Sequence, residues 1–73
     1  MNNENNRLKE LRQEKGYTQA VVAGLLGYYT NTYQRWEHDI YTMKLPDLIT
    51  IAKFYNVSLD YLAGLTDEKR KHW

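Results

Sequence analysis

The sequence contains no cysteine, a single proline and no long run of apolar residues. Without cysteine the chain has no disulfide, no thiolate metal ligand and no thiol nucleophile, a composition that suits a reducing, cytoplasmic location. The longest mainly apolar run, residues 20–27, is far shorter than the roughly 20 residues that cross a membrane. The first residues also lack the apolar stretch of a signal peptide. We therefore expect a domain that does not associate with a membrane.

A strong charge of either sign is also missing. Ten Lys and Arg residues stand against nine Asp and Glu residues, giving a net charge of +1 over 73 residues. Because a chain this short must bury most of its apolar residues to fold, little surface remains for a large active-site cavity. We divide the chain into a polar arm at residues 1–5, one globular domain at residues 6–66 and a basic tail at residues 67–73.

The spacing of apolar and turn-forming residues predicts five short helices and no strands. Gly16, Gly27, Asn56 and Gly64 suit the left-handed conformation that ends a helix. Thr18 and Ser58 suit helix starts, and Pro46 with Asp47 suits the first turn of another. The stripes expected to face inward are Leu8 and Leu11; Val22, Ala23 and Leu26; Tyr33 and Trp36; Leu48, Ile51, Ala52 and Tyr55; and Leu59 and Leu62. The fold class expected is all-α.

The two central helices and their short turn have the arrangement that presents one helix to the major groove of DNA. From residue 16 to residue 36 the only charged side chain is Arg35, so no carboxylate would repel phosphate. The polar arc opposite Tyr33 and Trp36 carries hydrogen-bonding groups able to read base edges. Its members are Thr30, Asn31, Gln34 and Arg35. Any amphipathic surface helix also has a polar stripe, so this pattern alone leaves a purely solvated face open as the alternative.

Several spaced motifs make the sequence recognisable. They are residues 7–12 (RLKELR), residues 15–19 (KGYTQ), Ala23 with residues 26–27 (LG), residues 35–37 (RWE) and residues 57–62 (VSLDYL). Over residues 6–66 the chain resembles the Cro/phage-repressor (XRE-type) helix-turn-helix family. The resemblance implies a compact five-helix, repressor-like DNA-binding domain whose third helix, at residues 30–37, is the recognition helix. It also implies a homodimer on a near-palindromic double-stranded DNA operator.

The resemblance assigns roles to individual residues. It implies an ion pair between Arg12 and Glu37 that joins the first and third helices. Gln19, in the first turn of the second helix, is expected to bind phosphate with its amide and the free backbone N–H groups. The other residues expected along the DNA backbone are Thr18, Tyr29, His38 and Tyr41.

The chain also departs from the family pattern. Tyr29 stands where Ser or Thr commonly caps the recognition helix, and a tyrosine cannot cap in that way. His38 and Asp39 replace the usual Asn-Gly, and Ile40 and Tyr41 replace the basic residues that usually follow. These changes weaken the expected grip on phosphate but leave the expected fold unchanged.

No residues point to catalysis, to a metal or to another cofactor. His38 lies between Glu37 and Asp39, but adjacent helical side chains diverge and no second histidine lies within a turn. Ser58 is better explained as a helix cap than as a nucleophile. We therefore expect a protein that is not an enzyme.

Two functions remain open on this sequence. The first is a sequence-specific DNA-binding transcriptional regulator, repressor-like, that reads the major groove with its third helix. The alternative is a protein-interaction module on the same fold with weak or no DNA binding, whose partner would contact Val21, Leu25 and Tyr28. A weak homodimer is expected around Tyr61, Leu65 and Trp73.

Overall fold

The structure is a computed structural model that describes residues 7–69. This part of the chain contains five α-helices and one turn of 3-10 helix, with no strand. The elements are α1 (Arg7–Glu14), α2 (Gln19–Leu26), α3 (Thr30–His38), η1 (Ile40–Thr42), α4 (Leu45–Tyr55) and α5 (Leu59–Ala63). The predicted all-α, five-helix fold is confirmed. The polar arm and the last four residues of the basic tail, Trp73 included, lie outside the described residues.

Four helix boundaries lie at the residues that the sequence indicated, while α3 ends at His38, one residue later than predicted. The Oγ1 atom of Thr18 accepts a hydrogen bond from the backbone N–H of Val21 at 3.1 Å. Ser58 caps α5 in the same way, because its Oγ accepts from the N–H of Tyr61 at 2.9 Å. Gly27 ends α2 at φ 83° and Asn56 ends α4 at φ 61°, both in the left-handed region. Local residue chemistry therefore sets these four helix boundaries.

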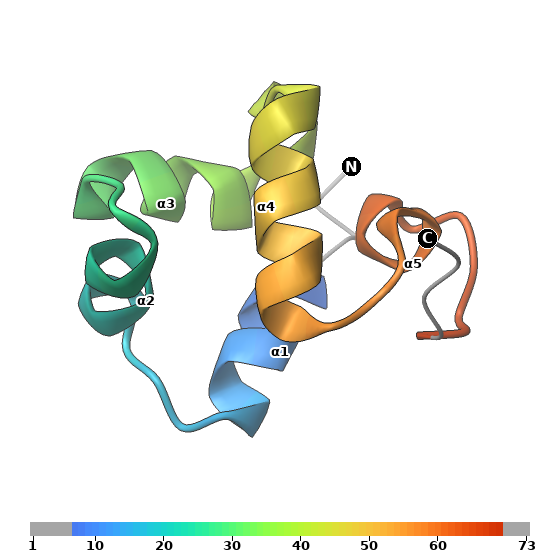
Figure 1. Ribbon diagram of the computed structural model, residues 1–73, viewed down its shortest axis with the longest axis horizontal. Helices are drawn as coiled ribbons and strands as arrows, with labels where there is room; N and C mark the ends of the chain where they lie inside the picture. Colours follow the sequence, from blue (N-terminus) through green and yellow to red (C-terminus); the bar gives the residue numbers. More distant parts are fainter. Residues whose placement is uncertain (1–6, 70–73) are drawn as a thin grey trace.

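The core is made from the inward face of every helix. Fully buried side chains come from each α-helix in turn: Leu8, Val22, Tyr33, Ile51 and Leu62. Each such side chain contributes roughly 1.5–3 kcal/mol through its removal from water. Leu26, Leu48 and Leu59 are only partly buried and pack against the edge of this core. The core holds α2 and α3 together on one side of α4, with α5 on the other side (Figure 1).

The turn η1 is an element that the sequence did not predict. Asp39 caps it, since its Oδ1 accepts a hydrogen bond from the N–H of Tyr41 at 3.1 Å. Ile40 is only 5% exposed and belongs to the core. An apolar residue at position 40 therefore closes the core beneath the end of α3. The family pattern indicated only the loss of a basic side chain at this position.

We expected Tyr61 to lie in a contact between two copies of the chain. It is instead buried within the domain and is not available for that contact. Tyr61 is 6% exposed as a residue, and the Arg7 guanidinium lies 4.2 Å from the centroid of its ring. Arg7 also donates to the carbonyl oxygens of Tyr61 at 2.9 Å and Thr66 at 2.6 Å, and pairs with Asp67 at 2.6 Å. The expectation for Tyr61 is wrong because α1 and the segment after α5 cover it. Leu65, in contrast, is 77% exposed.

Candidate nucleic-acid interface

The outer face of α3 presents four hydrogen-bonding side chains together. Thr30, Asn31, Gln34 and Arg35 are all exposed. On the opposite face of the same helix, Tyr33 is fully buried and Trp36 is 5% exposed. Because two aromatic anchors fix the rotation of α3 about its axis, the polar arc of the helix is held toward solvent. This arc can donate and accept hydrogen bonds along a surface that carries no exposed carboxylate between residues 16 and 36.

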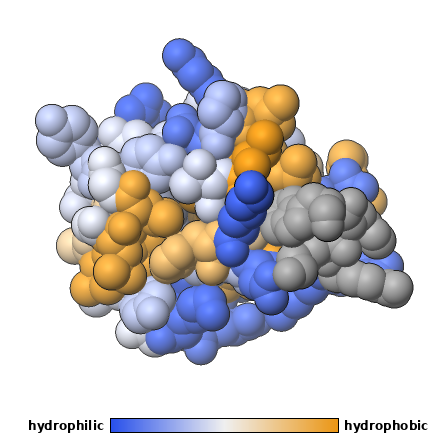
Figure 2. Space-filling view, viewed as in Figure 1, coloured by the Kyte–Doolittle hydropathy of each residue, from blue (hydrophilic) through white to orange (hydrophobic). Residues whose placement is uncertain are grey.

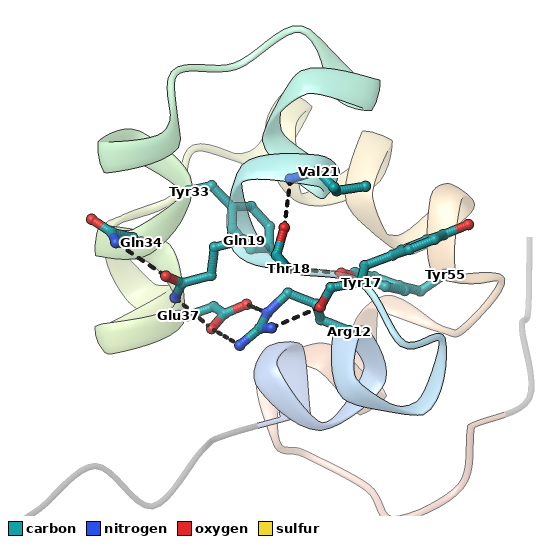
Figure 3. Close-up of polar contacts among 9 residues, drawn as sticks. All are labelled: Arg12, Tyr17, Thr18, Gln19, Val21, Tyr33, Gln34, Glu37 and Tyr55. Atoms are coloured by element: carbon teal, nitrogen blue, oxygen red, sulfur yellow. Dashed lines mark hydrogen bonds and ion pairs between the residues drawn. The ribbon is translucent and has the colours of Figure 1, made fainter.

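An ion pair between α1 and α3 holds this helix against the domain (Figure 3). Arg12 and Glu37 are the residues for which the resemblance implied a pair. The Nε atom of Arg12 lies 2.6 Å from Oε2 of Glu37, and Nη2 donates to Oε1 at 3.2 Å. The two side chains are only 11% and 5% exposed. The hydrogen bonds from Arg12 to this carboxylate raise the pKa of the guanidinium above its usual value.

Arg12 makes a further contact that the sequence did not reveal. Its Nη1 donates to the backbone carbonyl of Tyr17 at 2.9 Å, in the turn between α1 and α2. One guanidinium therefore joins three parts of the chain: its own helix, the turn at residue 17, and the end of α3. The five fixed N–H donors of arginine suit this role, whereas the compact ammonium of lysine would not.

Gln19 and Gln34 extend the ion pair toward the surface. The Nε2 atom of Gln19 donates to Oε1 of Glu37 at 2.9 Å, and Nε2 of Gln34 donates to Oε1 of Gln19 at 3.1 Å. Gln19 is half-buried and Gln34 is exposed. Two residues that we expected to act separately, one on phosphate and one on bases, are thus in direct contact. No feature of the sequence signalled this contact, because it depends on how α2 and α3 cross.

The remaining expected backbone contacts lie around the ends of α2 and α3. Tyr29 precedes α3 with its side chain 82% exposed, and it makes no side-chain capping bond, as its replacement of Ser or Thr predicted. His38 is exposed at the other end of α3. Tyr41 is 72% exposed, while its hydroxyl donates to the carbonyl of Ala63 at 2.9 Å. The side chain of Thr18 caps α2 and remains exposed. Contact between these residues and phosphate stays a prediction.

The apolar patch expected on α2 is smaller than the sequence suggested. Val21 is 45% exposed and Leu25 is 61% exposed, and Figure 2 shows hydrophobic side chains gathered over α2. Tyr28 does not extend the patch. Its ring packs edge-on against Trp36 at 4.8 Å, and its hydroxyl donates to Asp47 at 2.8 Å. Burial, followed by this hydrogen bond, raises the pKa of the Tyr28 hydroxyl.

A buried pair of tyrosine hydroxyls lies behind the interface. The hydroxyl oxygens of Tyr33 on α3 and Tyr55 on α4 are 2.8 Å apart. Desolvation is the main cause that raises the pKa of both groups, so each is held neutral. Within residues 7–69 every buried side-chain nitrogen and oxygen has a hydrogen-bond partner. The helix that carries the polar arc is therefore anchored by satisfied polar contacts as well as by apolar packing.

Over residues 7–69, no three His, Cys, Asp or Glu side chains come together in a way that could hold a metal ion. None of the helices in that range has the length and apolar character needed to cross a membrane.

Comparisons with known proteins give a family and three related regulators. The helix-turn-helix family matches residues 8–62. The HTH-type transcriptional regulator ImmR of Bacillus subtilis is 38% identical over 66 residues, which cover 90% of this chain and 52% of ImmR. The uncharacterized HTH-type transcriptional regulator YobD of B. subtilis is 34% identical over 62 residues, 85% of this chain and 55% of YobD. PrpR of Mycobacterium tuberculosis, also an HTH-type transcriptional regulator, is 30% identical over 63 residues, 86% of this chain and 13% of PrpR.

The chain thus spans about half the length of the first two of these relatives. The names of all three describe transcriptional regulators rather than enzymes. No solved structure matches the chain.

Proposed function

The chain belongs to the helix-turn-helix family of DNA-binding transcriptional regulators, and from this premise we propose that it is a sequence-specific, repressor-like regulator that reads the major groove with α3. One observation carries the proposal. The exposed face of α3 is polar, lacks carboxylates and is fixed in orientation by Tyr33, Trp36 and the Arg12–Glu37 pair. A rigid helix with donors and acceptors on its outer face is what direct readout of base edges requires.

Asn31 and Arg35 are the proposed main base readers. An amide can form two hydrogen bonds with adenine, and a guanidinium can form two with guanine. Thr30 and Gln34, on the same exposed arc, add single contacts. These four residues would carry the sequence information.

The proposed contacts to the DNA backbone come from the rim of this face. Thr18 and Gln19 lie at the start of α2, where free N–H groups favour an anion. Tyr29, His38 and Tyr41 lie before and after α3. Phosphate contacts of this kind set the register of the protein on the duplex without reading its sequence.

A second function is favoured by one observation, the exposed Val21 and Leu25 on a helix without any charged residue. A protein partner that covered these side chains would use the same fold as an interaction module with weak or no DNA binding. The small net charge of +1 also agrees with this alternative.

We further propose that two copies bind one operator as a weak homodimer, because paired half-sites one helical turn apart need two recognition helices. The exposed Leu65 after α5 is the described residue proposed for this contact. The protein would act without catalysis or a cofactor, and in the cytoplasmic compartment that holds the DNA.

Selection from a pool of random duplexes at low salt tests the proposal. We expect enrichment of a sequence with half-site symmetry. Asn31→Ala and Arg35→Ala should each cost about 1–3 kcal/mol and relax the preference at one base pair. Lys9→Ala, an exposed change on α1, is the control and should leave the preference intact. If the wild type enriches no sequence, the result favours the protein-interaction module over the DNA-binding regulator.

The dependence on salt provides a second readout. Between residues 16 and 36 the chain brings one formal positive charge to the groove. Affinity should therefore fall less with added salt than the roughly thousand-fold or greater loss of proteins that make about 6–10 phosphate contacts. A steep loss would show that basic residues elsewhere hold the phosphates.

A further inference from the structure

A continuous chain of side-chain hydrogen bonds leads from the buried ion pair to the exposed face of α3 (Figure 3). Arg12 donates to Glu37 at 2.6 Å, Gln19 donates to Glu37 at 2.9 Å, and Gln34 donates to Gln19 at 3.1 Å. Glu37 is almost fully buried, Gln19 is half-buried, and Gln34 faces solvent.

The carboxylate of Glu37 fixes which group donates and which accepts along these hydrogen bonds. A carboxylate paired with arginine accepts hydrogen bonds and donates none. Gln19 must therefore turn its NH₂ group toward Glu37, which leaves its carbonyl oxygen facing Gln34. Gln34 must in turn offer its NH₂ group to that oxygen, and its own carbonyl oxygen points outward, as Figure 3 shows. The orientation of both amides follows from the network.

A glutamine held in this way differs from a free one. A free side chain can rotate by half a turn about its last bond and present either the oxygen or the nitrogen to a base. Gln34 would lose its bond to Gln19 by rotating, so its carbonyl oxygen stays outward and one of its two amide N–H groups remains free. In the major groove, adenine and cytosine offer an amino group as donor, whereas guanine and thymine offer a carbonyl oxygen. A carbonyl oxygen held outward meets a donor on adenine and cytosine and another oxygen on guanine and thymine, so it favours the first class.

We propose that Gln19 is a positioning residue that holds the carbonyl oxygen of Gln34 outward and so makes α3 prefer adenine or cytosine over guanine or thymine at one base position. The inference rests on the proposed function, in which α3 reads base edges. Gln19 keeps a second amide N–H for phosphate, because Glu37 takes only one of the two. Loss of the Gln19 side-chain amide should therefore change the base preference as well as the overall affinity for DNA.

Binding to four duplexes that differ only at the Gln34-dependent base pair tests this proposal. That pair is identified as the one whose preference Gln34→Ala abolishes. The wild type should prefer adenine or cytosine by at least about fivefold. Gln19→Met, which keeps the aliphatic stem and removes the amide, should reduce this ratio to about twofold or less. Gln13→Met, at an exposed glutamine of α1, is the matched control and should leave the ratio unchanged.

Three outcomes distinguish a failure of this inference from a failure of the proposed function. If Gln19→Met weakens all four duplexes equally and preserves the ratio, the positioning role is wrong while readout by α3 stands. If the wild type prefers guanine or thymine at that pair, the acceptor assignment is wrong. If the wild type binds no duplex selectively, the proposed function and the inference both fail.

A measurement on the free wild-type protein avoids any dependence on how well the variants fold. Side-chain ¹⁵N relaxation should show the Gln34 amide to be more ordered than the exposed amide of Gln13, because only Gln34 is held by Gln19. Equal mobility of the two amides would overturn the proposal.

Discussion

Replacing Arg12 by methionine removes the guanidinium from a nearly buried ion pair and keeps most of the volume of the side chain. Glu37, whose side chain is 5% exposed, would lose both hydrogen bonds from Arg12 and keep the one from Gln19. The carbonyl of Tyr17 would lose its donor as well. Breaking one side of a buried pair leaves an uncompensated charge, which typically costs about 3–5 kcal/mol.

This cost is large for a domain of 73 residues. At about 0.05–0.15 kcal/mol per residue, its whole free energy of unfolding is about 4–11 kcal/mol. Each kcal/mol lowers the thermal midpoint by about 4–8 °C at this size, so Arg12→Met should lower the midpoint by at least about 12 °C. Circular dichroism during thermal and urea unfolding measures both quantities.

Two further variants make the test specific. Glu14→Gln removes a pair with Lys69 whose side chains are about half exposed, and should change stability by no more than about 0.5 kcal/mol. The double variant Arg12→Met with Glu37→Met should be more stable than Arg12→Met alone, because no unpaired charge remains buried. A loss below about 1 kcal/mol in Arg12→Met would refute the reasoning, since the pair would then behave like an exposed one.

Three other predictions concern stability and association. Unfolded tyrosines lose their protons near pH 10, while the raised pKa values of Tyr33 and Tyr55 keep the folded hydroxyls protonated; stability should therefore fall as the pH rises above about 10, and Tyr33→Phe should flatten the fall in urea titrations. Ser58→Ala removes the cap on the N–H of Tyr61 and should cost about 1 kcal/mol by urea unfolding, and no loss would contradict the capping role. In sedimentation on a full operator we expect two copies per duplex, with Leu65→Glu weakening the second; a single wild-type copy would remove the proposed dimer.

The helix boundaries were predictable because their signals are local. Thr18 and Ser58 cap the helices that directly follow them, and Gly27 and Asn56 adopt the left-handed conformation where the apolar stripe stops. Each of these interactions joins residues only a few positions apart, so a short stretch of sequence is enough to predict it. The helix-turn-helix fold followed from such signals together with spaced motifs that cover most of the chain.

The contacts between helices were harder to predict because they depend on packing. Gln19 and Gln34 meet only because α2 and α3 cross at the right place, and neither residue reveals the other. Tyr61 is buried partly by Arg7, which lies 54 residues earlier in the chain. The sequence near Tyr61 does not show this contact, so the residue looked suitable for an interface. Ile40 looked like a missing charge until η1 placed it in the core. Side-chain type indicated what these residues can do, and tertiary structure decided which of those possibilities each one adopts.

The contact between Arg7 and the segment after α5 has a consequence for chain topology. Arg7 bonds to the carbonyls of Tyr61 and Thr66, and Lys69 pairs with Glu14, so side chains tie the start of the domain to the segment after α5. A loop of this length costs little more entropy to close than one half as long, since the cost grows only with the logarithm of length. We expect a circular permutant, in which a short linker joins these two segments and the chain opens in the turn at Gly16, to keep the described helices. In such a variant the order of the helices along the chain would change while their arrangement in space stayed the same.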